Sequence, residues 1–286
     1  MTPVKPDSRP KVALSFDVEE WFHASVMEKY VPRASWHKQP SRLAEQVDNL
    51  LEFLEAIDAK ATFFCLGILT ERHTQVLRTI ADAGHELGSH GMSHKNLYDL
   101  SHEDLRREIV DSKRALEDAI GVAIEGYRAA NFSITDVAMD HMMEANYRYD
   151  SSVYAVEWHP NYGRLMKYPM RSDQPYSLVN GLWEVPLTVN KVLGFKMPWS
   201  GGAYLRHFPF GQFKSGFVRQ AKKGYAQIYL HPWELDPYQP LPGSMSNLDR
   251  RRHSGGIDKV ASRLESLNKS VAFCTIDKVL SSFRTS

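Results

Sequence analysis

Carboxylates and imidazoles follow several apolar runs of this sequence, and both kinds of side chain can bind a cation or move a proton. Residues 15–23, SFDVEEWFH, place Asp17, Glu19 and Glu20 directly after the apolar residues 12–14. Side chains on a strand alternate between two faces, so we expect Asp17 and Glu19 to share one face, roughly 7 Å apart at the backbone. Two carboxylates facing one pocket are tolerated when a cation lies between them or a base holds one of them. We expect Glu20 to be solvated.

A pair of histidines forms the second group. His90 and His94 lie in the segment SHGMSH, where a spacing of four around a glycine suits a loop that brings both rings onto one ion. Two histidines and one carboxylate are a common ligand set for Zn²⁺ or another divalent metal, and they leave positions open for water and substrate. The pair alone is more often a surface feature, so the metal hypothesis depends on its placement opposite Asp17 and Glu19.

Arg128 and His231 complete the candidate set. Arg128, in YRAANFS, can pair bidentately with Asp17 and hold it ionised. The AANF turn that follows can point a backbone N–H into the pocket, as an amide hydrolase needs for its oxyanion. His231, in IYLHPWELD, is suited to donate a proton to a leaving amine. Taken singly, an exposed arginine and a core histidine are the commoner interpretations.

The elements that must position these residues alternate along the chain. Helical periodicity marks residues 41–59, 70–83, 101–120, 134–145, 209–222 and 249–268. Short apolar runs between them predict strands, and about seven such units without a break predict an α/β fold, a distorted (β/α)7-type barrel in a single domain. Residues 1–10 are predicted to form a tail, and 155–205 an irregular insertion in the domain of residues 11–286. The candidate residues all follow strands, where such barrels carry their chemistry.

Composition narrows the function classes. The chain has 286 residues, and 35 basic against 34 acidic residues give a net charge of +1, so nothing indicates a nucleic-acid partner. No stretch approaches the ~20 apolar residues of a membrane span. Cys65 and Cys274 lie in apolar runs and are predicted to be free thiols, typical of a reducing compartment. The polar, proline-rich start has no apolar core of secretory length, so the expected location is cytoplasmic.

Five motifs in order resemble a known family. SFDVE, SHGMSH, YRAANFS, YDSS and LHP are similar to the motifs of the NodB-type polysaccharide deacetylases, carbohydrate esterases of family 4 type with a distorted (β/α) barrel. The closest resemblance is to a bacterial subgroup associated with exopolysaccharide and O-antigen clusters. Its members carry SFDVE-[DE]-WF and an SGG-Y-R stretch, which SGGAYLRHFP at residues 200–209 matches. The resemblance runs from about residue 11 to 276, nearly the whole chain.

The resemblance implies a metal site and a base. Asp17 would be the general base, and Glu19, His90 and His94 would hold a divalent metal, zinc with cobalt or nickel as alternatives. Many family members have two adjacent aspartates, of which the second binds the metal, but this chain has Val18 there. Branches with an acidic residue two positions after the base use that residue instead, which assigns Glu19.

The resemblance also implies the remaining catalytic roles. Arg128 would orient the base, the backbone N–H of Asn131 would stabilise the oxyanion, and Asp150 would tune His231, the general acid. The third motif usually has Pro and Ser where this chain has Ala130 and Asn131. Alanine keeps the turn and loosens it, which bears on the oxyanion geometry.

The implied reaction is the metal-dependent hydrolysis of an N-acetyl group on an amino sugar of a bacterial polysaccharide or its precursor, with release of acetate. The expected partner is therefore an N-acetylated glycan. Two alternatives stay open, namely a metal-independent amide or ureide hydrolase of the same superfamily and a catalytically silent carbohydrate-binding protein. Metal content separates the first alternative from the deacetylase, and acetate release separates the second.

Overall fold

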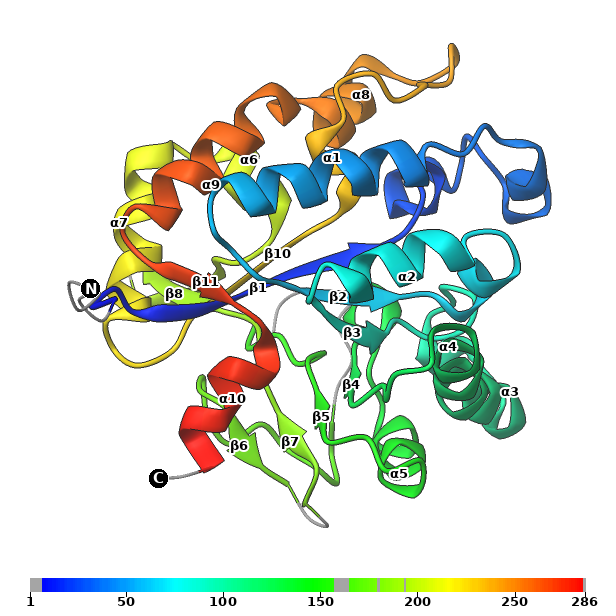
Figure 1. The fold of residues 1–286 in the computed structure, drawn as a ribbon, viewed down its shortest axis with the longest axis horizontal. Coiled ribbons are helices and arrows are strands. Elements are labelled where there is room, and N and C mark those ends of the chain that lie inside the picture. Colours follow the sequence, from blue (N-terminus) through cyan, green and yellow to red (C-terminus); the bar gives the residue numbers. More distant parts are fainter. Residues whose placement is uncertain (1–6, 157–164, 179–180, 193, 285–286) are drawn as a thin grey trace.

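A curled, mostly parallel sheet organises the fold (Figure 1). The structure is a computed structural model that describes residues 7–156, 165–178, 181–192 and 194–284. Its strands are β1 (Lys11–Val18), β2 (Thr62–Cys65), β3 (Glu86–Ser89), β4 (Gly126–Tyr127), β5 (Tyr149–Asp150), β6 (Tyr176–Ser177), β7 (Trp183–Glu184), β8 (Val189–Val192), β9 (Phe195–Pro198), β10 (Gln227–Leu230) and β11 (Ala272–Cys274). Within the described residues, a nine-stranded sheet has the order β10-β1-β2-β3-β4-β5-β7-β6, and β11 also pairs with β1. β8 and β9 form a separate hairpin.

Helices cover the outside of this sheet. They are α1 (Leu43–Ala56), α2 (Thr74–Asp82), α3 (His102–Arg106), α4 (Ser112–Ile120), α5 (Asp136–Glu144), α6 (Gly202–His207), α7 (Phe210–Ala221), α8 (Asn247–Ser254), α9 (Val260–Asn268) and α10 (Ile276–Arg284). Figure 1 shows α1 and α9 along one side of β1, and α2 to α5 along the strands that follow it. Among the described residues, none of these helices is long and apolar enough to span a membrane.

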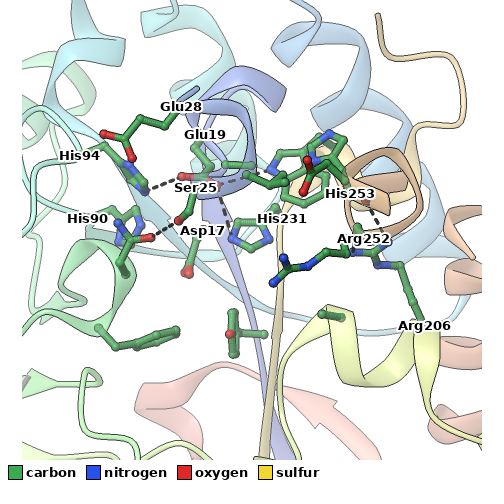
Figure 2. A pocket seen from close by; sticks show the side chains of 18 of the residues that line it. Asp17, Glu19, Ser25, Glu28, His90, His94, Arg206, His231, Arg252 and His253 are labelled. Atoms are coloured by element: carbon green, nitrogen blue, oxygen red, sulfur yellow. Dashed lines mark hydrogen bonds and ion pairs between the residues drawn. The ribbon is translucent and has the colours of Figure 1, made fainter. Parts of the chain in front are cut away.

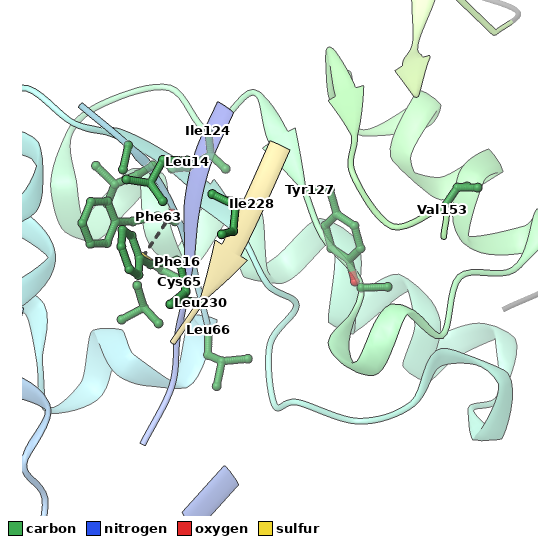
Figure 3. Close-up of a cluster of buried hydrophobic side chains, with 14 of the residues drawn as sticks. Leu14, Phe16, Phe63, Cys65, Leu66, Ile124, Tyr127, Val153, Ile228 and Leu230 are labelled. Atoms are coloured by element: carbon green, nitrogen blue, oxygen red, sulfur yellow. Dashed lines mark hydrogen bonds between the residues drawn. The ribbon is translucent and has the colours of Figure 1, made fainter. Parts of the chain in front are cut away.

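Alternation along β1 separates the core from the site. Leu14 and Phe16 point toward the helices and pack with Phe63, Ile228 and Leu230, all fully buried (Figure 3). Burying such side chains contributes about 1.5–3 kcal/mol each, so this layer fixes the register of β1. The same register turns the odd-numbered residues, which include the polar ones, to the inside of the curl.

The inside of the curl is apolar at one end and polar at the other. At the end where the strands begin, Ile276 and Leu280 of α10 cluster with Ala13, Phe64 and Tyr149. Helix α10 therefore closes that end. Polar groups and a cavity of about 750 Å³ lie where the strands finish, the end at which the sequence predicted the chemistry.

The barrel is distorted because the parallel strands β7 and β10 do not meet in a ladder. Among the described residues no ladder joins β7 to β10, and the side chain of Gln227 spans the gap instead. Its Nε2 donates to the carbonyls of Val185 and Pro186, both at 2.9 Å. The predicted α/β fold is confirmed as a curled half-barrel in one continuous sheet.

Two predicted helices differ from the structure in their interiors. Residues 101–120 are helical, but a π-helical segment, Arg107–Asp111, separates α3 from α4. The segment 249–268 breaks at Gly256, whose φ of 75° lies in the left-handed region, so α8 and α9 are separate. The predicted insertion at 155–205 is described only in part, since residues 157–164 lie outside the described residues; β6 to β9 fall within it. Both cysteines are free, as predicted.

A pair of buried carboxyl groups joins β5 to β7. Asp150 and Glu184 are register partners, and both are fully buried. Burial, together with the neighbouring Asp150, raises the pKa of Glu184 well above its ordinary value, and burial raises the pKa of Asp150 to about 6. Burial therefore favours the protonated form of Glu184 beside Asp150, while its Oε1 accepts the N–H of Val153 at 3.1 Å.

We expect Glu184→Gln to stabilise the fold increasingly as the pH rises. The folded protein holds a proton on Glu184 that the unfolded chain releases near pH 4.5, so the wild type loses stability as the pH rises above that value. A carboxamide donates to Asp150 at every pH. The free energy of unfolding of the variant, relative to wild type, should rise by at least about 1 kcal/mol between pH 5 and pH 8.

Thermal denaturation across that pH range measures the difference. The exposed Glu52 of α1 provides the control, because Glu52→Gln removes a solvated carboxylate. A difference between Glu184→Gln and wild type that does not change with pH would show that Glu184 ionises normally in the folded protein.

Candidate active site

Arg128 holds Asp17 at the end of β1. The Arg128 side chain is fully buried and its five N–H donors are all used. Nη1 donates to Ser15 Oγ and to Asp17 Oδ1, both at 2.8 Å. Nε donates to the Ser151 carbonyl at 3.0 Å. Nη2 donates to Ser151 Oγ at 3.0 Å and to Gln227 Oε1 at 3.2 Å. The expected pairing with Asp17 is present through one carboxylate oxygen and not as a bidentate contact, because the other donors serve three strands.

Glu19, His90 and His94 converge beside Asp17 (Figure 2). Each offers one ligand atom, and these atoms lie within 4.8 Å of one another. The Oε2 atom of Glu19 lies 2.7 Å from Nε2 of His94. The Nδ1 atom of His90 is hydrogen-bonded to the carbonyl of Arg128 at 2.9 Å, which leaves Nε2 for the cluster. A backbone partner on the second ring nitrogen is the usual way to orient a metal-ligating histidine.

The state of these groups fits a divalent metal. Burial lowers the pKa of His90 to about 4, so its imidazole is neutral, the form that ligates metals. Burial alone would raise the pKa of Glu19, but the imidazoles of His94 and His231 hold it well below its ordinary value. Glu19 Oε2 is buried and, apart from the close approach of His94 Nε2, has no hydrogen-bond partner among the described residues, so a cation held between the two would satisfy this oxygen. Two imidazoles and a carboxylate are a set typical of zinc.

His231 lies on the other side of Glu19. Its Nε2 is 3.4 Å from Oε1 of Glu19, and its Nδ1 is 3.0 Å from Oε2 of Glu234. Glu234 is in turn held by Nε of Arg206 at 2.9 Å. The ring stacks on Trp233, with 4.8 Å between centroids and 15° between planes. Burial alone would lower the pKa of His231, but the carboxylates of Glu19 and Glu234 raise it to about 9.

The partner of His231 is therefore Glu234 and not Asp150, which corrects the sequence-based expectation. Asp150 is fully buried between β5 and β7, where it accepts from Ser152 and Glu184. Glu234 follows His231 by three residues on the turn Pro232–Leu235, and a reciprocal capping arrangement joins the two. The sequence did carry this signal, since an acidic residue three positions after a turn-initiating residue is a capping pattern.

A glycine makes room for this carboxylate. A Cβ on Gly202, at the start of α6, would lie 2.2 Å from Oε2 and 2.4 Å from Oε1 of Glu234. Arg206 lies four residues further on the same helix. The SGGAYLR stretch thus supplies both the space and the counter-charge for Glu234.

Asn131 lies in the turn Ala130–Phe132 with left-handed backbone geometry, as does the next residue, with φ values of 51° and 57°. Its side chain links two loops: Oδ1 accepts from Ser25 Oγ at 2.8 Å, and Nδ2 donates to Asn96 Oδ1 at 2.9 Å. The residue that replaces the usual serine thus fastens the turn through its carboxamide. Asn tolerates the left-handed region better than other non-glycine residues.

Glu20 is buried and not solvated, contrary to expectation. Its Oε2 accepts the backbone N–H of Arg42 at 3.3 Å, at the start of α1. A carboxylate at a helix amino terminus is favoured by the helix dipole. The crowded acidic residues after β1 therefore have separate partners.

A cavity of about 750 Å³ contains the group. Its lining includes Asp17, Glu19, His90, His94, Asn131, Arg206, His231, Trp233, Arg252 and His253. A smaller cavity of about 350 Å³ adjoins it and shares Ser25, Glu28, His94 and Asn131. Figure 2 shows the labelled acidic and imidazole side chains directed into the larger cavity.

Two family models match adjacent parts of the chain. A polysaccharide deacetylase model matches residues 5–149, and a domain of unknown function (DUF3473) matches residues 151–281. The first part contains Asp17, Glu19, His90 and His94, and the second contains His231. The site therefore draws on both parts.

Curated relatives and solved structures agree with the first model. The chain is 28% identical over 141 residues to the peptidoglycan deacetylase of Helicobacter pylori, which covers 49% of this chain and 47% of the relative. It is also 28% identical over 152 residues to a peptidoglycan-N-acetylglucosamine deacetylase of Bacillus cereus, covering 50% and 55%. The chain thus spans about half the length of the curated relatives it matches.

The fold is shared over almost the whole chain. A Mycobacterium smegmatis structure assigned as a polysaccharide deacetylase superposes with a TM-score of 0.62 at 20% identity, covering 99% of this chain and 93% of that one. The peptidoglycan deacetylase PdaC of Bacillus subtilis gives 0.52 at 15% identity, covering 97% and 93%. With a family model matching half of its length, a matching fold and a site at the ends of the strands, this chain belongs to the polysaccharide deacetylase family.

Proposed function

We propose that this protein hydrolyses the N-acetyl group of an amino sugar in a bacterial polysaccharide or its precursor and releases acetate. The reaction would use a divalent metal, zinc or alternatively cobalt or nickel, held by Glu19, His90 and His94. The observation that carries the proposal is the convergence of these three ligand atoms within 4.8 Å, beside an arginine-held Asp17 and His231. The motif resemblance supports a substrate from exopolysaccharide or O-antigen assembly.

In this proposal Asp17 is the general base. When bound, the metal would polarise the acetamide carbonyl and lower the pKa of a water molecule. Asp17 takes a proton from the attacking water, and the water oxygen bonds to the acetamide carbon. Arg128 orients Asp17 through Oδ1, and among the described residues no hydrogen bond occupies Oδ2. That oxygen is available for the proton.

The second half of the reaction concerns the oxyanion and the leaving amine. The backbone N–H of Asn131, which the turn at residues 130–132 positions, donates to the tetrahedral oxyanion. In the metal-free protein the carboxylates of Glu19 and Glu234 raise the pKa of His231 to about 9 against the effect of burial, and Glu234 is the one of the two that holds no metal in this proposal. His231 donates its proton to the sugar nitrogen, the carbon–nitrogen bond breaks, and acetate and the free amine leave. Glu234 keeps the ring oriented.

Metal content is the first test. Purified wild-type protein, reloaded with zinc, cobalt or nickel, should contain about one divalent ion per chain, because the three donors form one site. The His90→Ala/His94→Ala double variant should contain none while keeping its circular dichroism spectrum. An ion that stays in the double variant would place the site elsewhere, and no ion in either protein would favour the metal-independent hydrolase or the silent binder.

Asp17→Asn separates the base from the metal site. The variant should keep its metal, because Asp17 is not a ligand, and should lose at least about 10²-fold in acetate release from N-acetylated glycans, the range expected for removing a general base. Glu28→Gln, which changes another carboxylate lining the cavity, is the matched control and should keep most of its activity. An Asp17→Asn enzyme with wild-type turnover would refute the assigned base.

The third test concerns the acid. In metal-free protein, His231 should titrate near pH 9 despite its burial, because Glu19 and Glu234 stabilise its charged form. Glu234→Gln should bring the pKa of His231 down by at least about 1, since it removes one of those carboxylates. Histidine side-chain NMR measures both values, with Glu28→Gln as control. An unchanged pKa in Glu234→Gln would show that Glu234 does not tune the acid.

A further inference from the structure

The loop of residues 90–94, which carries His90 and His94, is fastened through its backbone on one side. The carbonyl of Gly91 accepts the N–H of Gly67 at 2.9 Å, and the carbonyl of Met92 accepts the N–H of Ile68 at 3.0 Å. These bonds tie the loop to the segment that follows β2. They fix where the loop lies and leave the N–H groups of its middle residues to other partners.

Those N–H groups bind a buried glutamate. Oε2 of Glu108 accepts the backbone N–H of Met92 at 2.7 Å and that of Ser93 at 2.9 Å, while Oε1 accepts the Ser93 hydroxyl. The Glu108 side chain is 5% exposed. Among the described residues, it forms no hydrogen bond with Glu19 or with the rings of His90 and His94. Hydrogen bonds to an ionised carboxylate are about twice as strong as those between neutral groups, so this one side chain restrains two successive peptide units.

Glu108 reaches the loop from an unusual piece of helix. It belongs to the π-helical segment Arg107–Asp111 between α3 and α4. A π-helical turn inserts a residue into the helical repeat and frequently marks a functional site. The loop also conforms closely to the carboxylate, since a Cβ on Gly91, whose φ is 81°, would lie 3.0 Å from Oε2 of Glu108.

An arginine fastens the opposite side of the loop. Arg33 donates through Nη1 to the carbonyl of Ser93 and through Nη2 to that of His94, the latter at 2.8 Å. Its guanidinium lies 4.3 Å from the ring centre of Trp36. His94 has a left-handed φ of 59°, a conformation that a residue with a Cβ keeps only when its surroundings enforce it. Arg33 and Glu108 provide that enforcement from two sides.

We propose that Glu108 is a positioning residue that holds loop 90–94 with His90 and His94 directed at one point before an ion binds, with Arg33 as the opposing restraint. This inference rests on the proposed function, because the ion that the two histidines would bind is the proposed catalytic metal. The proposed effect is preorganisation of the site. Without Glu108, part of the free energy of ion binding is used to order two peptide units and the left-handed backbone of His94. Partners of this kind typically change metal affinity by about 10–100-fold when removed.

Glu108→Gln is the principal variant, because it keeps the volume but removes the negative charge, so that its carboxamide oxygen accepts only the weaker neutral hydrogen bonds from Met92 and Ser93. The control is Glu117→Gln in α4. Glu117 also accepts a backbone N–H, that of Ile124 at 2.9 Å, so this variant weakens a comparable structural bond away from the loop in the same way. Two quantities are measured on each protein: hydrogen–deuterium exchange of residues 89–96 without metal, and the dissociation constant for Co²⁺ by competition with a chelator.

The expected result is that Glu108→Gln exchanges faster than wild type at Met92 and Ser93 and binds Co²⁺ at least about 10-fold more weakly. Glu117→Gln should match wild type in both measurements even if its Tm falls. Arg33→Met should weaken Co²⁺ binding in the same direction, and it tests the restraint independently if Glu108→Gln does not fold.

Two outcomes would overturn the proposal. Unchanged exchange in Glu108→Gln would show that Glu108 does not hold the loop, and faster exchange with an unchanged Co²⁺ dissociation constant would show that holding the loop does not serve the site. If wild-type protein binds no Co²⁺, the proposed metal-dependent function fails instead, and the exchange measurement alone then decides whether Glu108 positions the histidines.

Discussion

The structure depends on a charged group that it buries completely. The guanidinium of Arg128 lies inside the curled sheet, where removal from water costs several kcal/mol unless every donor is satisfied. Its donors reach β1, the residue after β5, and β10, and the ring of Phe64 covers one face with its centre 4.2 Å away. Breaking any of these contacts leaves a buried charge uncompensated. The same cation therefore joins the paired strands β1 and β10 to the end of β5, which has no ladder with either in the described part of the chain, and it fixes the carboxylate of Asp17.

This constraint explains why acidic residues can crowd the end of β1. Asp17 and Glu19 face the same way because of the pleat, and each is neutralised by a different cationic or imidazole group, while Glu20 turns away to the start of α1. Repulsion among carboxylates at this spacing would cost several kcal/mol in a low dielectric without those partners. The partners come from residues far along the chain, so the cluster exists only in the folded protein.

Local patterns predicted the parts of the site that depend on local geometry. Alternation along a strand placed Asp17 and Glu19 on one face, and the spacing of His90 and His94 predicted a shared ion. Asp150 was assigned to His231 by family order, but it lies in a different layer, and the contact belongs to Glu234 on the turn after His231. Glu108 was hidden because helical periodicity over 101–120 does not reveal a π-helical turn. The capping spacing after His231 is a sequence signal for Glu234, whereas nothing in the spacing of residues 101–120 indicates where the π-helical turn directs Glu108.

The division of the chain into two matched regions has a chemical counterpart. The proposed base and metal donors lie in residues 5–149, whereas the proposed acid, its carboxylate partner and the arginine that holds that partner lie in residues 151–281. Without an acid, a tetrahedral adduct would revert more readily than it expels the amine, because an unprotonated amine is a poor leaving group. Gly202 provides the space in which Glu234 contacts both Arg206 and His231. In the proposed reaction the second region would therefore supply the step that commits the substrate to products. Gln227 of β10 joins the two regions, because its Oε1 accepts from Nη2 of Arg128 while its Nε2 donates to the carbonyls of Val185 and Pro186.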